Sequence, residues 1–321
     1  MHKHFLIKAA GGQSPLLLET YLSNHIRHYN PELVLQYLSE QRILVNDTPV
    51  TVGYRVCPGD EIFVLQPYSN YRKEPKPQAI ALEILYEDEN LIVVNKPAGM
   101  AIHPGLGTYE GTLLNALLHH LDGQKPFFVH RLDKHTSGPL VIAKDQETAT
   151  MLKNCFALQK PLRIYEALAW GTFGQTSGTV DIPIGRNPDK PESIEASPKH
   201  LFGKPAITHF KIKKTFKQAT WLELKLTTGR THQIRVHLQY MGHSVINDTR
   251  YPCEHSFHEC SLEMGSLSPH HMLSSTLLGF EHPHKHIMLE FKVEPPANFK
   301  EALKLLEKQS QSGEKNESIS F

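Results

Sequence analysis

The chain has 321 residues, of which 34 are Lys or Arg and 33 are Asp or Glu, so its formal net charge is +1. This length accommodates about two domains with a good-sized core. A net charge so close to zero excludes nucleic-acid binding through a global field, and any such binding must come from local clusters of basic residues.

The N-terminal part of the chain, residues 1–68, is predicted to form a small α/β unit. Apolar spacing from Leu16 to Ile26 and from Pro31 to Gln41 indicates two short helices. Residues 43–50 indicate two strands joined by a turn, and residues 56–64 indicate another turn and strand. The polar, Pro- and Lys-containing residues 69–80 that follow predict a linker.

Residues 81–300 are predicted to form a second domain in which strands predominate. Leu91 to Val94 indicates a buried strand, and two helices should be capped by Thr112 and Asp145 and end near Gly123 and Gln159. Further strands are expected at residues 165–170, 208–216, 221–227 and 287–293. Many strands and few helices predict an α+β domain built on a mostly antiparallel sheet with flanking helices. The Ser-, Glu-, Lys- and Gln-rich residues 308–321 predict a disordered tail.

One carboxylate, Asp133, lies in an unusual local sequence. The segment at residues 130–138 reads His-Arg-Leu-Asp-Lys-His-Thr-Ser-Gly, and an apolar run from Pro139 to Ala143 follows as a short buried strand. A carboxylate held against a buried strand is costly unless a nearby group keeps it charged. Asp133 therefore either caps its own turn through backbone hydrogen bonds or serves a chemical function.

A second notable feature is a basic stretch, residues 196–222, which contains six lysines and no acidic residue. Within it the apolar residues Phe210 and Ile212 alternate with Lys211 and Lys213, which predicts a strand with one apolar and one basic face. The basic face is either merely solvated or contacts phosphate, and we favour phosphate contact.

Four segments, taken together, resemble the motifs of the RluA-type RNA pseudouridine synthases. These segments are residues 95–105, residues 130–138, Arg-Ile-Tyr-Glu-Ala-Leu at 163–168, and Thr-Gly-Arg-Thr-His-Gln-Ile-Arg-Val-His-Leu at 228–238. They occur in the order of the family. The resemblance implies a pseudouridine synthase fold with the active site in a cleft across the sheet, isomerisation of uridine in RNA, and no cofactor.

The reaction itself explains why a carboxylate is needed. Pseudouridine forms when the bond from ribose C1′ to uracil N1 breaks, the base turns and C5 bonds to C1′. An ionised carboxylate can either attack C1′ or remove a proton from C2′. The resemblance names Asp133 for this role. Because a pocket for a flipped base disfavours the charged form, we expect a buried cation beside it.

The resemblance assigns this cation to Arg235, with Arg230 as the alternative, on a helix that we expect Thr231 to cap and Gly242 to end. Tyr165 is expected to stack on uracil, and its hydroxyl is placed to help remove the C5 proton. Arg131 is implied to fill the space left by the flipped base; phosphate contact is the alternative. The candidates for substrate binding are Arg131, His130, Arg230, Leu226, Ile234, Lys211 and Lys213.

The resemblance also implies that the N-terminal unit is an S4-like RNA-binding module, although few basic residues lie where its RNA-facing helical surface would be. The remaining basic candidates are His25, Arg27, His28 and Arg42. Such a module suggests large-subunit ribosomal RNA as the target and leaves tRNA open. Three departures from the family pattern are Asn247–Asp248 in place of Gly-Asp, Leu273–Ser275 where a His is common, and Pro139 where a branched apolar residue is usual. A non-catalytic RNA-binding ribosome-assembly factor is the competing class, and the retained Asp133, Tyr165 and Arg235 argue against it.

Cysteine use and hydropathy bear on the compartment. The four cysteines form no CxxC pair, which indicates a reducing environment and no zinc knuckle. A group at residues 253–260 contains two Cys and two His, but its spacing matches no common zinc site. No apolar run approaches the roughly 18–20 residues of a membrane helix. We therefore expect a cytoplasmic, monomeric protein without a metal, whose partner is RNA.

Overall fold

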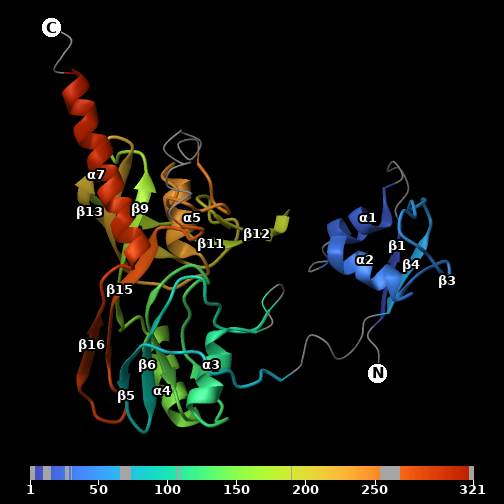
Figure 1. Cartoon of the computed structure of the whole chain (residues 1–321), viewed down its shortest axis with the longest axis horizontal. Helices are drawn as coiled ribbons and strands as arrows, with labels where there is room; N and C mark the ends of the chain where they lie inside the picture. Colours follow the sequence, from blue (N-terminus) through green and yellow to red (C-terminus); the bar gives the residue numbers. More distant parts are fainter. Residues whose placement is uncertain are drawn as a thin grey trace. The chain divides into compact units, whose positions relative to one another are not determined.

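The computed structural model of the protein describes residues 4–9, 16–25, 29, 31–65, 74–105, 108, 110–188, 190–253 and 268–317. The chain divides into two compact units, one running from Met1 to Glu74 and the other comprising residues 75–104 and 108–321 (Figure 1). Each unit has its own cluster of buried apolar side chains. No helix in the described ranges is both long and apolar enough to cross a membrane.

The first unit packs two helices against a small antiparallel sheet. The helices are α1 (Leu18–His25) and α2 (Pro31–Ser39), as the apolar spacing predicts. The sheet has the order β1-β4-β2-β3, formed by His4–Lys8, Glu61–Leu65, Ile43–Val45 and Thr48–Pro49. Strand β1 was not predicted, because its apolar residues show neither alternation nor a turn signal before them.

Only the end of the predicted linker can be followed, because residues 66–73 lie outside the described part of the chain. That end is attached to the second unit. The Asn115 side chain donates to the Lys76 carbonyl at 2.8 Å, and the Gln78 amide donates to the Asn115 carbonyl at 3.0 Å. The segment at residues 76–78 therefore behaves as the beginning of the second unit.

The second unit is built on two antiparallel sheets, which confirms the predicted α+β class. A six-stranded sheet has the order β10-β13-β14-β9-β15-β16, and a four-stranded sheet has the order β5-β6-β8-β7. The strands of the larger sheet are Ser177–Asp181, Ile207–Thr215, Ala219–Leu226, Leu162–Trp170, Leu273–Glu281 and Met288–Lys292. Those of the smaller sheet are Ile84–Glu87, Leu91–Lys96, Gly138–Ala143 and Phe127–Phe128. A separate hairpin pairs β11 (Ile184–Asn187) with β12 (Lys190–Ala196).

A parallel bridge between Ser137 and Ser274 joins the two sheets just before β8 and near the start of β15. This bridge matters for the site, since residues 130–137 lead directly into β8. The loop that carries Asp133 is thereby held against the larger sheet, next to β9.

The helices of this unit are α3 (Leu113–His120), α4 (Gln146–Ala157), α5 (Gln233–Tyr240) and α7 (Ala297–Glu317). Two predicted caps are confirmed: the side chain of Thr112 accepts from the Asn115 amide, and that of Asp145 accepts from the Thr148 amide. The prediction that Thr231 caps α5 is wrong. His232 occupies the cap position in a left-handed conformation, with φ of 58° and no side-chain cap.

The cap at Thr231 is unnecessary because the side chain of Gln233 organises this turn. Its carbonyl oxygen accepts from the Thr228 hydroxyl at 2.8 Å and from the Arg230 amide at 3.0 Å.

The prediction that residues 308–321 form a disordered tail is wrong for the first part of this range. Helix α7 continues through Glu317, and residues 318–321 lie outside the described ranges. The buried side chains of Phe299, Ala302 and Leu306 fix the first half of α7 on the domain. The Lys, Glu and Gln residues that follow are good helix formers and extend it.

Candidate active site

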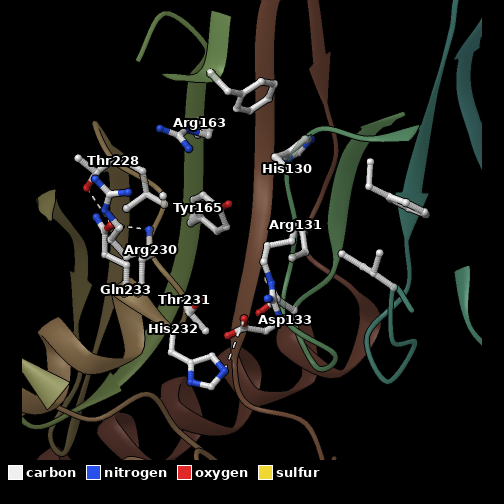
Figure 2. A pocket seen from close by; sticks show the side chains of 18 of the residues that line it. His130, Arg131, Asp133, Arg163, Tyr165, Thr228, Arg230, Thr231, His232 and Gln233 are labelled. Atoms are coloured by element: carbon white, nitrogen blue, oxygen red, sulfur yellow. Dashed lines mark hydrogen bonds and ion pairs between the residues drawn. The ribbon is translucent and has the colours of Figure 1, made fainter. Parts of the chain in front are cut away.

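A cavity of about 830 Å³ opens on the larger sheet of the second unit. Its walls come from the loop at residues 130–134, helix α4, strand β9, and the turn between β14 and α5 (Figure 2). Eight predicted site residues line it: Asp133, Tyr165, Arg235, Arg131, His130, Arg230, Leu226 and Ile234. Residues separated by up to about a hundred positions in the chain are thus brought to one place.

The Asp133 loop is anchored by buried polar groups on both sides. The ammonium of Lys96, which is fully buried, donates to the carbonyls of Pro97, Met100 and Lys134 at 2.9, 3.0 and 3.3 Å. The Gly99 amide donates to the same Lys134 carbonyl. Burial lowers the pKa of Lys96 to about 7, and the charge of Asp133 opposes this shift.

Downstream of Asp133 the loop is anchored to the start of β15. The Thr136 hydroxyl hydrogen-bonds to the His271 ring at 2.8 Å, and the Ser137 and Ser274 hydroxyls lie 2.9 Å apart. Ser274 lies in the segment 273–275, where the sequence departs from the family pattern, and His271 lies just before that segment. Both hold the loop in this chain. The loop is therefore fixed before any substrate arrives.

The carboxylate of Asp133 forms the predicted ion pair with Arg235, at 2.9 Å from Nη1. Its main-chain oxygen, and not its side chain, accepts the turn hydrogen bond from Thr136. The turn-cap interpretation of Asp133 therefore does not describe its side chain. Arg230, the alternative partner, instead donates from Nε to the Pro205 carbonyl at 2.9 Å.

Arg235 also serves a second carboxylate. Its Nε and Nη2 donate to the two oxygens of Asp248 at 2.6 and 2.9 Å. Burial alone would lower the pKa of Arg235 and raise that of Asp248, but their mutual hydrogen bonds and charges shift both pKa values the other way. Both groups therefore stay ionised, and Arg235 keeps one donor for Asp133.

His232 approaches the other side of Asp133, with Nε2 3.9 Å from Oδ1. Its Nδ1 hydrogen-bonds to the Tyr251 hydroxyl at 2.7 Å, which orients the ring. Burial lowers the pKa of His232 to about 4, although the charge of Asp133 opposes this shift. At neutral pH the ring is uncharged and contributes shape, not charge, to the site.

Tyr165 forms a wall of the cavity from strand β9. It shares the buried face of the strand with Arg163 and Ala167, because every second residue of a strand points to the same side. The small side chain of Ala167 leaves room beside the ring. Burial raises the pKa of Tyr165, and the charge of Arg163 partly offsets this.

His130 closes the same side of the cavity as Arg163. Its Nε2 accepts a hydrogen bond from the Val141 amide at 3.1 Å, and its ring stacks on Phe156 with centroids 4.5 Å apart. Burial, with the charge of Arg163, lowers the pKa of His130 to about 3. The ring is therefore neutral, and its proton is on Nδ1.

Two predicted substrate-binding residues, Lys211 and Lys213, are not among the residues that line the cavity. Lys213 forms an ion pair with Glu166 at 2.7 Å and lies over the Trp221 ring, 4.1 Å from its centroid. Lys211 is exposed on β13, where it pairs in register with Glu223. The alternation of basic and apolar residues is real, but acidic residues of neighbouring strands face the basic ones.

Four groups that the sequence did not mark as site residues prove to shape the site: Lys96, Arg163, His232 and Asp248. Lys96, Arg163 and His232 lie inside motif segments, so position was a usable signal for them. Asp248 lies ten residues after the last segment. Residue type alone gave no reason to choose them over their neighbours.

Metal ligands were also considered. No group of three or more His, Cys, Asp or Glu that could hold a metal ion occurs among the described residues. Of the Cys and His group at residues 253–260, only Cys253 is described, and it accepts from the Ser244 amide and hydroxyl.

Comparison with known proteins bears directly on this cavity. The sequence model of the family described as RNA pseudouridylate synthase matches residues 90–240. The chain is 33% identical over 316 residues to "Uncharacterized RNA pseudouridine synthase YlyB" of Bacillus subtilis, covering 94% of this chain and 98% of that protein. It is 37% identical to "Ribosomal large subunit pseudouridine synthase D" of Vibrio parahaemolyticus, covering 81% of this chain and 82% of that protein.

Solved structures agree. The fold matches "Human RNA Pseudouridylate Synthase Domain Containing 1" with a TM-score of 0.56 and 26% identity, covering 68% of this chain and 85% of that one. It matches "Human RNA Pseudouridylate Synthase Domain Containing 4" with a TM-score of 0.56 and 25% identity, covering 70% and 93%. Both matches concern the fold that carries the cavity.

Proposed function

The chain belongs to the RNA pseudouridylate synthase family and is an RNA pseudouridine synthase, and from this premise we propose that it isomerises specific uridines of large-subunit ribosomal RNA in the cytoplasm. The observation that carries the proposal is the ion pair of Asp133 and Arg235 beside the buried ring of Tyr165 in one cavity. A carboxylate paired with an arginine next to an aromatic wall suits a reaction at the anomeric carbon of a flipped-out nucleotide.

Asp133 is the proposed catalytic group. Arg235 lies 2.9 Å from this carboxylate and forms an ion pair with it. The carboxylate then either attacks C1′ of the ribose or takes the proton from C2′. The anchored loop fixes its position before substrate binds, so little reorganisation is needed in the reaction.

Tyr165 is proposed to stack on the uracil, with Leu226 and Ile234 completing an apolar slot for the base. Its hydroxyl is proposed to help remove the C5 proton after the new bond has formed. At the cavity mouth Arg131 and Arg230 are exposed, and we propose that they contact the RNA around the flipped nucleotide. His130, held neutral, is proposed to line the base pocket.

The choice of ribosomal RNA rests on the relatives. A protein named "Ribosomal large subunit pseudouridine synthase D" aligns with most of this chain, and tRNA remains the alternative target. We also propose that the first unit is an S4-like module that positions the enzyme on structured RNA. We also propose that the enzyme acts as a monomer.

The experiment that tests this function maps pseudouridine in RNA treated with the purified protein. Large-subunit ribosomal RNA and total tRNA, both transcribed without modification, are incubated separately with the enzyme. We expect pseudouridine at one or a few positions of the ribosomal RNA. Pseudouridine only in tRNA would move the target to tRNA, and tight binding to either RNA without any pseudouridine would favour the non-catalytic assembly factor.

A further inference from the structure

Arg163 is a buried cation for which the structure shows no counter-charge. Its side chain lines the cavity, although the residue is only 7% exposed. Its Nη2 donates to the Thr227 carbonyl at 2.8 Å, and its Nε is buried without a partner. Within the described part of the chain, no carboxylate lies at ion-pair distance from it. Burial lowers the pKa of Arg163, and the group that opposes this shift is the ionisable hydroxyl of Tyr165.

The surroundings of Arg163 are neutral and tightly packed. Its guanidinium lies 5.8 Å from the centroid of the Phe156 ring, and the neighbouring His130 is uncharged. On the other side Gly229 touches it so closely that a Cβ there would come within 2.6 Å of Nη1. A buried charge is costly when it is unpaired, so an arginine held in this way calls for an anion that the free protein does not provide.

The cavity is therefore polarised along its length. Arg235 at one end is neutralised by two carboxylates, Asp133 and Asp248, whereas Arg163 at the other end is not neutralised. Figure 2 shows Tyr165 between Arg163 and Asp133. A uridine whose C1′ lies at Asp133 and whose base stacks on Tyr165 directs the far edge of its uracil ring toward Arg163.

Both routes open to Asp133 put a negative charge on that ring. When the C1′–N1 bond breaks, its electron pair stays with N1 and spreads onto the O2 and O4 oxygens. In the displacement route a carboxylate oxygen supplies the new bond to C1′; in the elimination route the C2′–H electrons form C1′=C2′ and the carboxylate takes the proton. When C5 later bonds to C1′, the C1′–O bond to the carboxylate breaks in the displacement route, and in the elimination route C2′ takes its proton back from the carboxylic acid. The C5 proton then leaves and N1 gains a proton, so no further reactant is needed.

We propose that Arg163 stabilises the uracil anion that exists between cleavage of the C1′–N1 bond and formation of the C5–C1′ bond. The proposal rests on the proposed pseudouridine synthase reaction. A fixed cation in a site that excludes water acts on charge that develops during the reaction, and it needs no reorganisation to do so. For RNA phosphates, by contrast, the cavity offers the exposed Arg131 and Arg230.

The test compares Arg163→Met and Arg163→Lys with the wild type in single-turnover reactions on two substrates. One RNA carries uridine at the target position, and the other carries 5-fluorouridine, whose base is a better leaving group. The rate of loss of the original nucleoside reports bond cleavage, and a filter-binding titration gives the RNA affinity. Arg230→Met serves as the matched control, because it removes an exposed arginine of the same cavity.

We expect Arg163→Met to slow cleavage of uridine about 100-fold or more, with Arg163→Lys intermediate and RNA affinity within a few-fold of wild type. The defect should be clearly smaller on 5-fluorouridine, whose anion needs less stabilisation. Arg230→Met should instead weaken RNA binding and show equal defects on both substrates.

Equal defects of Arg163→Met on the two substrates, or loss of affinity with an unchanged cleavage rate, would overturn the proposal. If Arg163→Met does not fold, the same comparison of substrates is made with Arg163→Lys, and an equal defect there overturns it too. Wild-type enzyme that forms no pseudouridine from uridine would contradict the proposed function itself, which separates the two failures.

Discussion

Individual charges around Asp133 are balanced through Arg235, which contacts two carboxylates at once. Asp248 accepts two hydrogen bonds from Arg235 as a bidentate pair, and the Asp248 side chain is only 1% exposed. The remaining Nη1 is directed at Asp133. Asp248 therefore sets the position of the guanidinium that pairs with Asp133.

Replacing Asp248 by Asn should reduce the free energy of unfolding by about 3 kcal/mol at pH 7, because it leaves a buried arginine with one carboxylate fewer. The pKa of Asp248 is lowered by Arg235 in the folded state. Its contribution to stability is therefore present above the unfolded pKa of about 4 and is lost as the pH falls below it. In urea titrations the difference in unfolding free energy between wild type and variant should become smaller from pH 5 to pH 3.

A suitable control for this comparison is Asp122→Asn, which changes an exposed carboxylate in a turn. It should leave the unfolding free energy nearly unchanged over the same range. If the difference in unfolding free energy between wild type and Asp248→Asn stays constant with pH, Asp248 contributes packing and not charge.

The sequence pointed to Asp133, the carboxylate that lies in the cavity, but could not decide every partner of it. Arg230 and Arg235 lie in the same motif, and only the fold shows that the first turn of α5 directs Arg235 to Asp133 while Arg230 bonds to a main-chain carbonyl. The sequence did not predict a role for Arg163, for a different reason. Its importance lies in a missing counter-charge, which is a property of the packed environment and not of the local sequence.

At the scale of elements, the position of the loop between β7 and β8 depends on the close contact of Gly138 with Ser275. Gly138 begins β8 with φ of +124°, and a Cβ there would lie 2.1 Å from the Ser275 carbonyl oxygen. Neither the backbone conformation nor the space admits a side chain. This contact lets the Asp133 loop lie directly against β15, where Ser137 and Ser274 bridge the two sheets.

Gly138→Ala should therefore destabilise the protein by about 2 kcal/mol or more, since strain and overlap with backbone atoms add. It should also lower activity by displacing the Asp133 loop. Gly174→Ala is the matched control, because no atom lies within 4 Å of a Cβ at that position. Thermal unfolding of both variants gives the comparison, and equal melting temperatures would show that the two sheets separate easily at this point.

Helices with clear caps were predicted well, because Thr112 and Asp145 offer side-chain oxygens to amides three residues on. Strand β15 was missed along its length. Its residues include Ser274, Ser275 and Thr276, all of which are buried. Because these residues are polar, the segment did not show the apolar pattern that predicts a central strand. The Ser274 hydroxyl bonds to Ser137 across the two sheets, whereas the Thr276 hydroxyl donates to the Ile164 carbonyl of the neighbouring strand β9. Composition alone does not reveal these partners.

As a whole molecule, the protein combines a catalytic unit with a separate small unit that has its own core. In the described part of the small unit, two candidate basic residues are already engaged. The His25 ring hydrogen-bonds to the Tyr21 carbonyl, and Arg42 pairs with Glu40. Arg27 and His28, the other basic candidates, lie outside the described residues.

Removing residues 1–74 should leave the catalytic unit folded, because the boundary between the compact units falls there and the attached segment at residues 76–78 is kept. We expect activity on a short stem-loop to survive, while the rate on long structured RNA falls. The slope of log K against log salt should change by about one unit or less, since each phosphate contact contributes roughly one unit. A loss of several units would identify the small unit as a major phosphate-binding surface.

The central claim, that Asp133 performs the chemistry, is tested most directly by Asp133→Asn. Single-turnover pseudouridine formation and RNA affinity are measured side by side for this variant and the wild type on the RNA that mapping identifies. Because the carboxylate acts in the chemical step, we expect the rate to fall below about 1 per cent of wild type while RNA affinity stays within a few-fold. A variant that folds, binds RNA and still forms pseudouridine at more than that rate would contradict the account.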